Sequence, residues 1–348
     1  METNLRPLSL GEILDRTAQL YRSHFLLFAG ISSVYAGVIL VLSLLQIGAQ
    51  ELLTALHWSQ YLIWATGLGM VILFLAIFIT GGVAVAANNR AVGWVHLGEP
   101  ATIRDAYGSI LPRIGRYLWL MAITTFIVWV PCLVIYGAYA VFIFAYLGPK
   151  GLSGAAGSQR DAGMMVVFGV VTLAFVVLLL AALVYAIVMA LRYSLAVPAC
   201  VVENLKARAA IRRSIELSKG SRWRILMLWI LAIVIQVGLI AITEGFFFVY
   251  ALKNQGTLPI ALRILQQVIA FFTTTFVGPI YATGMTLFYY DQRVRKEGYD
   301  IERMMQTSGL SEPVARIAPA TGPEFNTEIN PQPNPDTVVS QEPESTHE

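Results

Sequence analysis

The chain has 348 residues, of which 57% are hydrophobic and only 13% charged, with a mean hydropathy of +0.66. A soluble domain carries roughly a quarter charged residues, so this composition excludes an ordinary soluble protein. The net charge of +3 conceals an asymmetry: residues 1–303 hold 23 Lys and Arg against 14 Asp and Glu, whereas residues 304–348 hold one Arg against seven acids.

The first 25 residues form a basic segment that carries Arg6, Arg16 and Arg22. The segment lacks the short apolar core and the small-residue cleavage site of a signal peptide. We therefore expect it to be retained, and to form an interfacial helix over residues 1–25 ahead of the first span.

Six apolar runs follow, and each is long enough to cross a bilayer, which takes about 20 residues. The runs are 26–47, 61–87, 118–147, 164–191, 225–250 and 264–290. They lack the alternation of barrel strands, so they predict an all-α, polytopic transmembrane bundle within a membrane domain at residues 26–303. Pro131 and Pro279 fall inside two of the runs and predict kinks rather than breaks.

Basic residues set the expected orientation of these spans. Twenty Lys and Arg lie in the N-terminal segment, the second and fourth loops and the C-terminal segment, against four on the other side. Those four are Lys150, Arg160, Lys253 and Arg263. The count predicts that the N-terminus and the C-terminus are both cytoplasmic.

A short amphipathic stretch with an aromatic and basic end precedes each odd-numbered span. The three stretches are residues 10–25, 102–117 and 207–223. Thr17, Ser109 and Ser214 occupy equivalent places in them, spaced by 92 and then 105 residues. The pattern predicts three units, each a cytoplasmic amphipathic helix followed by a transmembrane hairpin. Independent convergence on the same anchoring chemistry is the alternative.

Polar groups inside the spans are where function would show. Glu244, near the outer end of the fifth span, either reaches the interface, pairs with Lys253 or Arg263, or acts as a working carboxylate. Asn88, Asn89 and Arg90 are interpreted as the end of the second span.

A threonine run in the sixth span, Thr273, Thr274 and Thr275, precedes Pro279. Its hydroxyls either satisfy carbonyls freed by the proline kink or form a polar lining at a broken helix, as in transport sites.

The stretch from Arg192 to Glu203 is unusual because only eight apolar residues separate the polar positions, which is too few to cross a bilayer. We expect it to bend at Pro198, either along the inner interface or under the bundle. The flanking Arg192 and Glu203 are expected to form a structural ion pair.

No catalytic or cofactor-binding constellation is visible in the sequence. The four histidines and two cysteines have no metal-ligand spacing, so we expect no metal site and no cofactor. Positive charge is scattered beside the membrane segments, which argues against nucleic-acid binding. Residues 304–348 are acidic, proline-rich and poor in large apolar residues, and they predict a disordered cytoplasmic tail.

Three stretches resemble a known family. They are Leu8–Arg16 with Tyr21–Phe25, then Arg192–Pro198 with Val202–Glu203 and Ala210–Arg224, and finally Tyr289–Asp300. Together they resemble the prokaryotic family called the membrane domain of glycerophosphoryl diester phosphodiesterase. The positions of this chain that carry the resemblance are Arg192, Pro198, Glu203, Arg213, Ser214, Gly220, Trp223, Asp291, Arg293, Glu297 and Gly298.

The resemblance implies a multi-pass protein of a bacterial cytoplasmic membrane. Some members of the family join this domain to a soluble phosphodiesterase barrel. The 348 residues leave no room for such a barrel, so we expect a stand-alone member without hydrolase activity.

Three functions remain open from the sequence. The first is a non-enzymatic scaffold or accessory protein in membrane and envelope lipid physiology, whose partners are anionic inner-leaflet lipids and either other proteins or further copies of itself. The second is a transporter or channel-like protein for a lipid or small solute. The third is an intramembrane enzyme. A polar cavity joining Glu244 and the threonines to an aqueous face would favour transport.

Overall fold

The computed structural model describes residues 6–152, 162–254 and 258–307. All regular secondary structure in these residues is helical, which confirms the predicted all-α class. The described residues up to Asp300 form one compact unit, and those from Ile301 belong to another.

In the described residues, six helices are long and apolar enough to cross a membrane, as the hydropathy predicted. They are α2 (Phe25–Ala55), α3 (Leu62–His96), α5 (Ile114–Leu152), α6 (Ala162–Tyr193), α9 (Arg222–Lys253) and α10 (Ile260–Glu297). Several continue beyond their apolar runs, because a helix needs apolar residues only where lipid surrounds it. Asn88 and Asn89, interpreted above as a helix end, are instead buried within α3.

Five shorter α-helices and two 3-10 turns make up the remaining regular structure of the described ranges. The helices are α1 (Leu10–Ser23), α4 (Ile103–Ile110), α7 (Ala196–Val202), α8 (Ala207–Ser218) and α11 (Tyr299–Thr307), and the turns are η1 (Ser59–Tyr61) and η2 (Leu111–Arg113). A capping box at Ser9 and Glu12 begins α1. Residues 304–307 lie in α11, so the predicted tail starts too early: Met304 and Met305 favour a helix. The rest of the tail lies outside the described residues.

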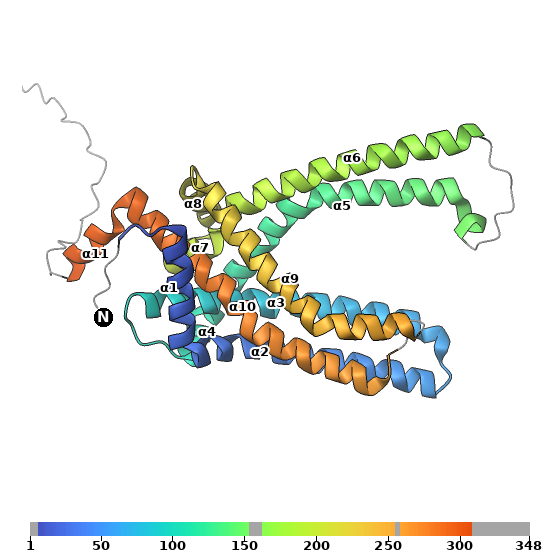
Figure 1. Cartoon of the computed structure of the whole chain (residues 1–348), viewed down its shortest axis with the longest axis horizontal. Coiled ribbons are helices and arrows are strands. Elements are labelled where there is room, and N and C mark those ends of the chain that lie inside the picture. Colours follow the sequence, from blue (N-terminus) through green and yellow to red (C-terminus); the bar gives the residue numbers. More distant parts are fainter. Residues whose placement is uncertain (1–5, 153–161, 255–257, 308–348) are drawn as a thin grey trace, which may run out of the picture. The chain divides into compact units, whose positions relative to one another are not determined.

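Packing joins consecutive long helices as well as the first and last of them. Helix α2 packs against α3, α5 against α6, and α9 against α10, while α10 also packs against α1, α2 and α3. Figure 1 shows α1, α7 and α8 near the same end of the long helices. We call this the charged end; it comprises α1, α7, α8, the first turns of α9 and the last turns of α10.

An aromatic ladder holds α5 to α6. The rings of Tyr139 and Phe175 stack with centroids 3.9 Å apart, and those of Tyr146 and Phe168 with centroids 4.8 Å apart. The Tyr139 hydroxyl lies 3.1 Å from that of Thr172. Stacked aromatic pairs of this kind stabilise the packing of two helices without any charged group.

The helix α10 continues through Pro279, as predicted. The nearby carbonyl of Phe276 accepts a hydrogen bond from the Tyr21 hydroxyl of α1, at 2.5 Å. Thr283 donates to the Pro279 carbonyl at 2.9 Å. Thr275 is one of the threonines whose hydroxyls were expected to satisfy carbonyls freed by the proline. It is buried, and its hydroxyl has no hydrogen-bond partner in the described part of the chain.

Candidate functional site

The charged end is built around a break between α6 and α7. Helix α6 ends at Tyr193, and α7 begins at Ala196. Ser214 of α8 spans the break: its hydroxyl donates to the Arg192 carbonyl at 2.7 Å and accepts from the Leu195 amide at 3.2 Å. Pro198 lies in the first turn of α7, where a helix tolerates a missing N–H. The bend therefore lies before Pro198 rather than at it, and α7 is largely buried.

Replacing Ser214 with Ala is expected to lower the free energy of unfolding by about 2 kcal/mol, because it leaves the buried Leu195 amide without this acceptor and removes a hydrogen bond to the Arg192 carbonyl. Thermal unfolding in detergent measures the effect. The control is Ser109→Ala, since Ser109 is only half-buried and bonds to Ala106 within its own helix. Equal losses in the two variants would contradict the assignment.

Glu203 lies at the centre of a first ionic cluster. Its two carboxylate oxygens accept from the Arg213 Nε at 2.9 and 3.0 Å, and Oε1 also accepts from the Tyr289 hydroxyl at 2.5 Å. Arg213 in turn contacts both oxygens of Glu297 at 2.5 and 2.6 Å. Arg293 donates to Glu297 at 3.2 Å. We call these five residues the Glu203 cluster.

The predicted ion pair between Arg192 and Glu203 is wrong. Glu203 is paired with Arg213, while the Arg192 Nη1 lies 4.0 Å from the sulfur of Met189. The Arg192 Nε is buried without a hydrogen-bond partner among the described residues. The reason is that α8 folds back beside α7, which brings Arg213 closer to Glu203 than sequence distance suggests.

Two carboxylates decide the ionisation of Arg213. Burial alone would lower the pKa of its guanidinium, but the hydrogen bonds to Glu297 and Glu203 outweigh burial and raise the pKa above its ordinary value. Arg213 therefore stays a cation, and its fork geometry holds two carboxylates at once.

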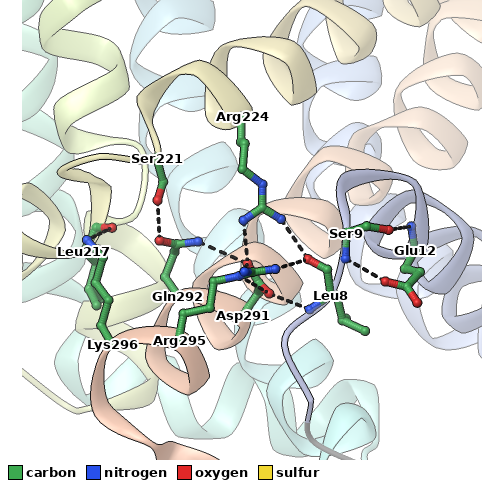
Figure 2. A network of polar contacts seen from close by, with 10 residues as sticks. All are labelled: Leu8, Ser9, Glu12, Leu217, Ser221, Arg224, Asp291, Gln292, Arg295 and Lys296. Carbon is green, nitrogen blue, oxygen red and sulfur yellow. Dashed lines mark hydrogen bonds and ion pairs between the residues drawn. The ribbon is translucent and has the colours of Figure 1, made fainter.

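Asp291 forms a second network, shown in Figure 2. Its side chain is fully buried and contacts Arg224 at 3.1 Å and Arg295 at 3.0 Å. The Leu8 amide also donates to Asp291, at 2.8 Å. The Leu8 carbonyl accepts from the same two arginines, at 2.8 and 2.6 Å. Asp291 thus fastens the N-terminal segment to α9 and α10.

Neighbouring polar groups extend this network. Gln292 donates to Asp291 at 3.1 Å and accepts from the Ser221 hydroxyl at 2.6 Å. Lys296 donates to the carbonyls of Glu216, Leu217 and Lys219 at 2.7–3.0 Å, so it caps the end of α8. Cations suit this position because the C-terminus of a helix carries partial negative charge.

Most residues carrying the family resemblance meet at the charged end. Gly220 and Gly298 have positive φ angles of 82° and 64°, just past α8 and α10, where a side chain would be strained. Trp223, by contrast, is exposed at the start of α9. The candidate site thus includes residues that sequence reasoning did not single out, namely Leu8, Ser221, Arg224, Tyr289, Gln292, Arg295 and Lys296.

The other predicted polar group lies toward the opposite end of the helices. Glu244 accepts from Gln266 at 2.5 Å. Lys253 and Arg263 were the partners considered for Glu244. Arg263 instead contacts Glu51 at 2.7 Å and Gln50 at 2.5 Å. Gln266 and Arg263 line a cavity of about 570 Å³, to which α2 adds Ser43, Gln46 and Gln50. Thr274 lines a separate cavity of about 50 Å³, and Gln267 lines both. Thr273 is half-buried.

The carboxylates of the charged end are occupied by arginines, and this limits the chemistry that they can carry out. The acids Asp291, Glu203 and Glu297 all bind arginine. Within the described ranges, no group of three His, Cys, Asp or Glu side chains is placed to hold a metal ion. The arrangement joins helices through paired charges, which is a positioning role.

Comparison with known proteins gives one family. Residues 168–318 match the family model described as the membrane domain of glycerophosphoryl diester phosphodiesterase. The matched range includes α7 to α10, and with them both ionic networks except Leu8. No curated protein and no solved structure matches the chain.

Proposed function

Through residues 168–318 the chain belongs to the family described as the membrane domain of glycerophosphoryl diester phosphodiesterase, and on that premise we propose a function. The protein is a non-enzymatic, multi-pass scaffold or accessory protein in membrane and envelope lipid physiology. Its activity is to hold lipids and partner chains at a membrane surface rather than to transform a substrate.

One observation carries this proposal: the carboxylates of Asp291, Glu203 and Glu297 at the charged end are each bound by arginine. Asp291 binds Arg224 and Arg295, and Glu203 binds Arg213. A working acid or base needs access to a substrate and a free position for a proton. Carboxylates fixed by arginines on several helices instead support a rigid platform.

The orientation is part of the proposal. Twenty basic residues against four support a charged end facing the cytoplasm of a bacterium, with three units in which α1, α4 and α8 each lead a hairpin. Helix α8 buries Ala210, Ser214 and Leu217 and exposes Arg208 and Arg212. Each exposed cation near an anionic leaflet contributes about 1 kcal/mol to binding.

A pair of reporter fusions tests the orientation. A green fluorescent protein fused after Arg303 is expected to fluoresce, and alkaline phosphatase at the same place is expected to be inactive. Fusions after Asn254, between α9 and α10, are expected to give the opposite pattern and serve as the control. Active phosphatase after Arg303 alone would overturn the orientation.

Native mass spectrometry of the full chain, purified in mild detergent, tests the scaffold role. Retained partner chains, further copies of the chain or bound lipid are the expected result. A bare monomer after extraction in several mild detergents would contradict it.

A second candidate function, transport of a small polar solute, is favoured by the cavity lined with Gln46, Gln50, Gln266 and Gln267. Amides inside apolar spans are costly unless they serve a ligand or each other. Flux of small polar solutes into proteoliposomes, compared with Gln46→Leu and Gln267→Leu, tests this role. Solute flux that both variants abolish would replace the scaffold proposal.

A further inference from the structure

A third polar region, lined in part by α1, is separate from both ionic networks. It is a cavity of about 1040 Å³ between α1 and the end of α3. The polar side chains that line it include two arginines and two histidines. The polar lining is Arg16, Gln19, Arg22, Ser23, His24, His96 and Glu99.

The arginines of this cavity differ from those of the networks. Arg213, Arg224 and Arg295 each bind a carboxylate. In the described residues, Arg16 and Arg22 form neither a hydrogen bond nor an ion pair. Glu99 adds one carboxylate to the lining, so positive charge is in excess. The cavity is therefore suited to an anion.

His96 supplies an independent indication of a ligand. Its side chain lies at the end of α3 with only 9% of its surface exposed, and its ring packs 5.0 Å from that of Tyr290. The Nδ1 atom is buried and has no hydrogen-bond partner among the described residues. His96 lines the cavity beside the two arginines. Buried polar atoms are nearly always paired, so its unpaired ring nitrogen leaves one hydrogen-bonding position of this residue open.

We propose that this cavity binds the phosphate group of an anionic membrane lipid, with Arg16 and Arg22 contacting the phosphate oxygens and His96 a further polar atom of the headgroup. Guanidinium groups bind phosphate through charged hydrogen bonds. The lipid is favoured over free phosphate because the apolar surface of α2 begins at Phe25 and Leu26, directly after His24, and Leu26 is 82% exposed. Acyl chains would lie against that surface.

This inference rests on the proposed function in one respect, namely that the charged end lies at a membrane surface. Its test uses the purified full chain and does not depend on partners or on which side faces the cytoplasm. The proposed function is tested in cells and by co-purification, so either one can fail alone.

Binding of dioctanoyl phosphatidylglycerol to the detergent-solubilised protein, measured by native mass spectrometry, tests the site. The Arg16→Gln and Arg22→Gln double variant is expected to bind about tenfold more weakly, because charged hydrogen bonds to the phosphate are lost. The matched control is the Arg104→Gln and Lys253→Gln double variant, which removes two exposed cations outside the cavity. Equal weakening in both variants would overturn the site.

Three further measurements separate the alternatives. Dioctanoylglycerol has the same chains without phosphate, and equal binding of it would overturn phosphate recognition. Inorganic phosphate that displaces the lipid at millimolar concentration would show that the site takes free phosphate. His96→Asn, at unchanged melting temperature, is expected to weaken lipid binding; unchanged affinity would remove His96 from the site.

Discussion

Replacing Asp291 with Asn is expected to lower the free energy of unfolding by about 3 kcal/mol, because it removes the buried counter-charge of two partly buried arginines. The Asp291 side chain is fully buried, while Arg224 and Arg295 are 28% and 37% exposed. The amide keeps the shape of the side chain but lacks its charge, so the loss reports electrostatics rather than a cavity. The variant also weakens the acceptor for the Leu8 amide.

Denaturant or thermal unfolding of the purified protein in one detergent measures this loss. Asp15→Asn is the control, because Asp15 is exposed on α1 and accepts a hydrogen bond from Gln19 of the same helix. The control is expected to change stability by no more than about 0.5 kcal/mol. Identical unfolding of Asp291→Asn and the native chain would show that the network does not hold the fold together.

The second large effect is expected in the Glu203 cluster. Glu203→Gln and Arg213→Gln should each cost about 2–3 kcal/mol, because each leaves the Glu203 cluster with one uncompensated charge in a place that water reaches poorly. Together they should cost less than the sum, with a coupling free energy of about 1 kcal/mol or more. The half-buried position of the pair, with exposures of 18% and 23%, sets this expectation.

The matching comparison is the pair Arg6 and Glu12, whose side chains are 64% and 41% exposed. A double-mutant cycle on that pair is expected to give a coupling free energy below about 1 kcal/mol. Additive losses at Glu203 and Arg213 would mean that the ion pair is incidental to the cluster.

The six spans could be predicted from the sequence because the bilayer imposes a length and an apolar composition on each of them. The continuation of α10 through Pro279 could also be predicted, since neighbouring groups can satisfy a helix backbone interrupted by proline. The contact between α1 and this part of α10 could not be predicted, because the Tyr21 hydroxyl that donates to the Phe276 carbonyl is 255 residues away in the chain.

The partners of the charged residues were less predictable, and the errors have a common cause. Arg192 and Glu203 flank one short stretch, yet the fold of α8 places Arg213 beside Glu203. Glu244 bonds to Gln266 because α9 and α10 pack together, while Arg263 contacts α2. Charges pair according to helix packing, and a single sequence does not report which helices are neighbours.

The hydrogen bond between Leu8 and Asp291 can form only late in the synthesis of the chain. The two residues are 283 positions apart, so at about 5–20 residues per second the N-terminal segment waits roughly 15–60 s before Asp291 has been made. Until then Arg224, which is made earlier than Asp291, also lacks its carboxylate. The beginning of the chain is therefore fastened only once the last membrane helix has been inserted, and α1 must stay undocked, or find other contacts, while the ribosome completes the protein.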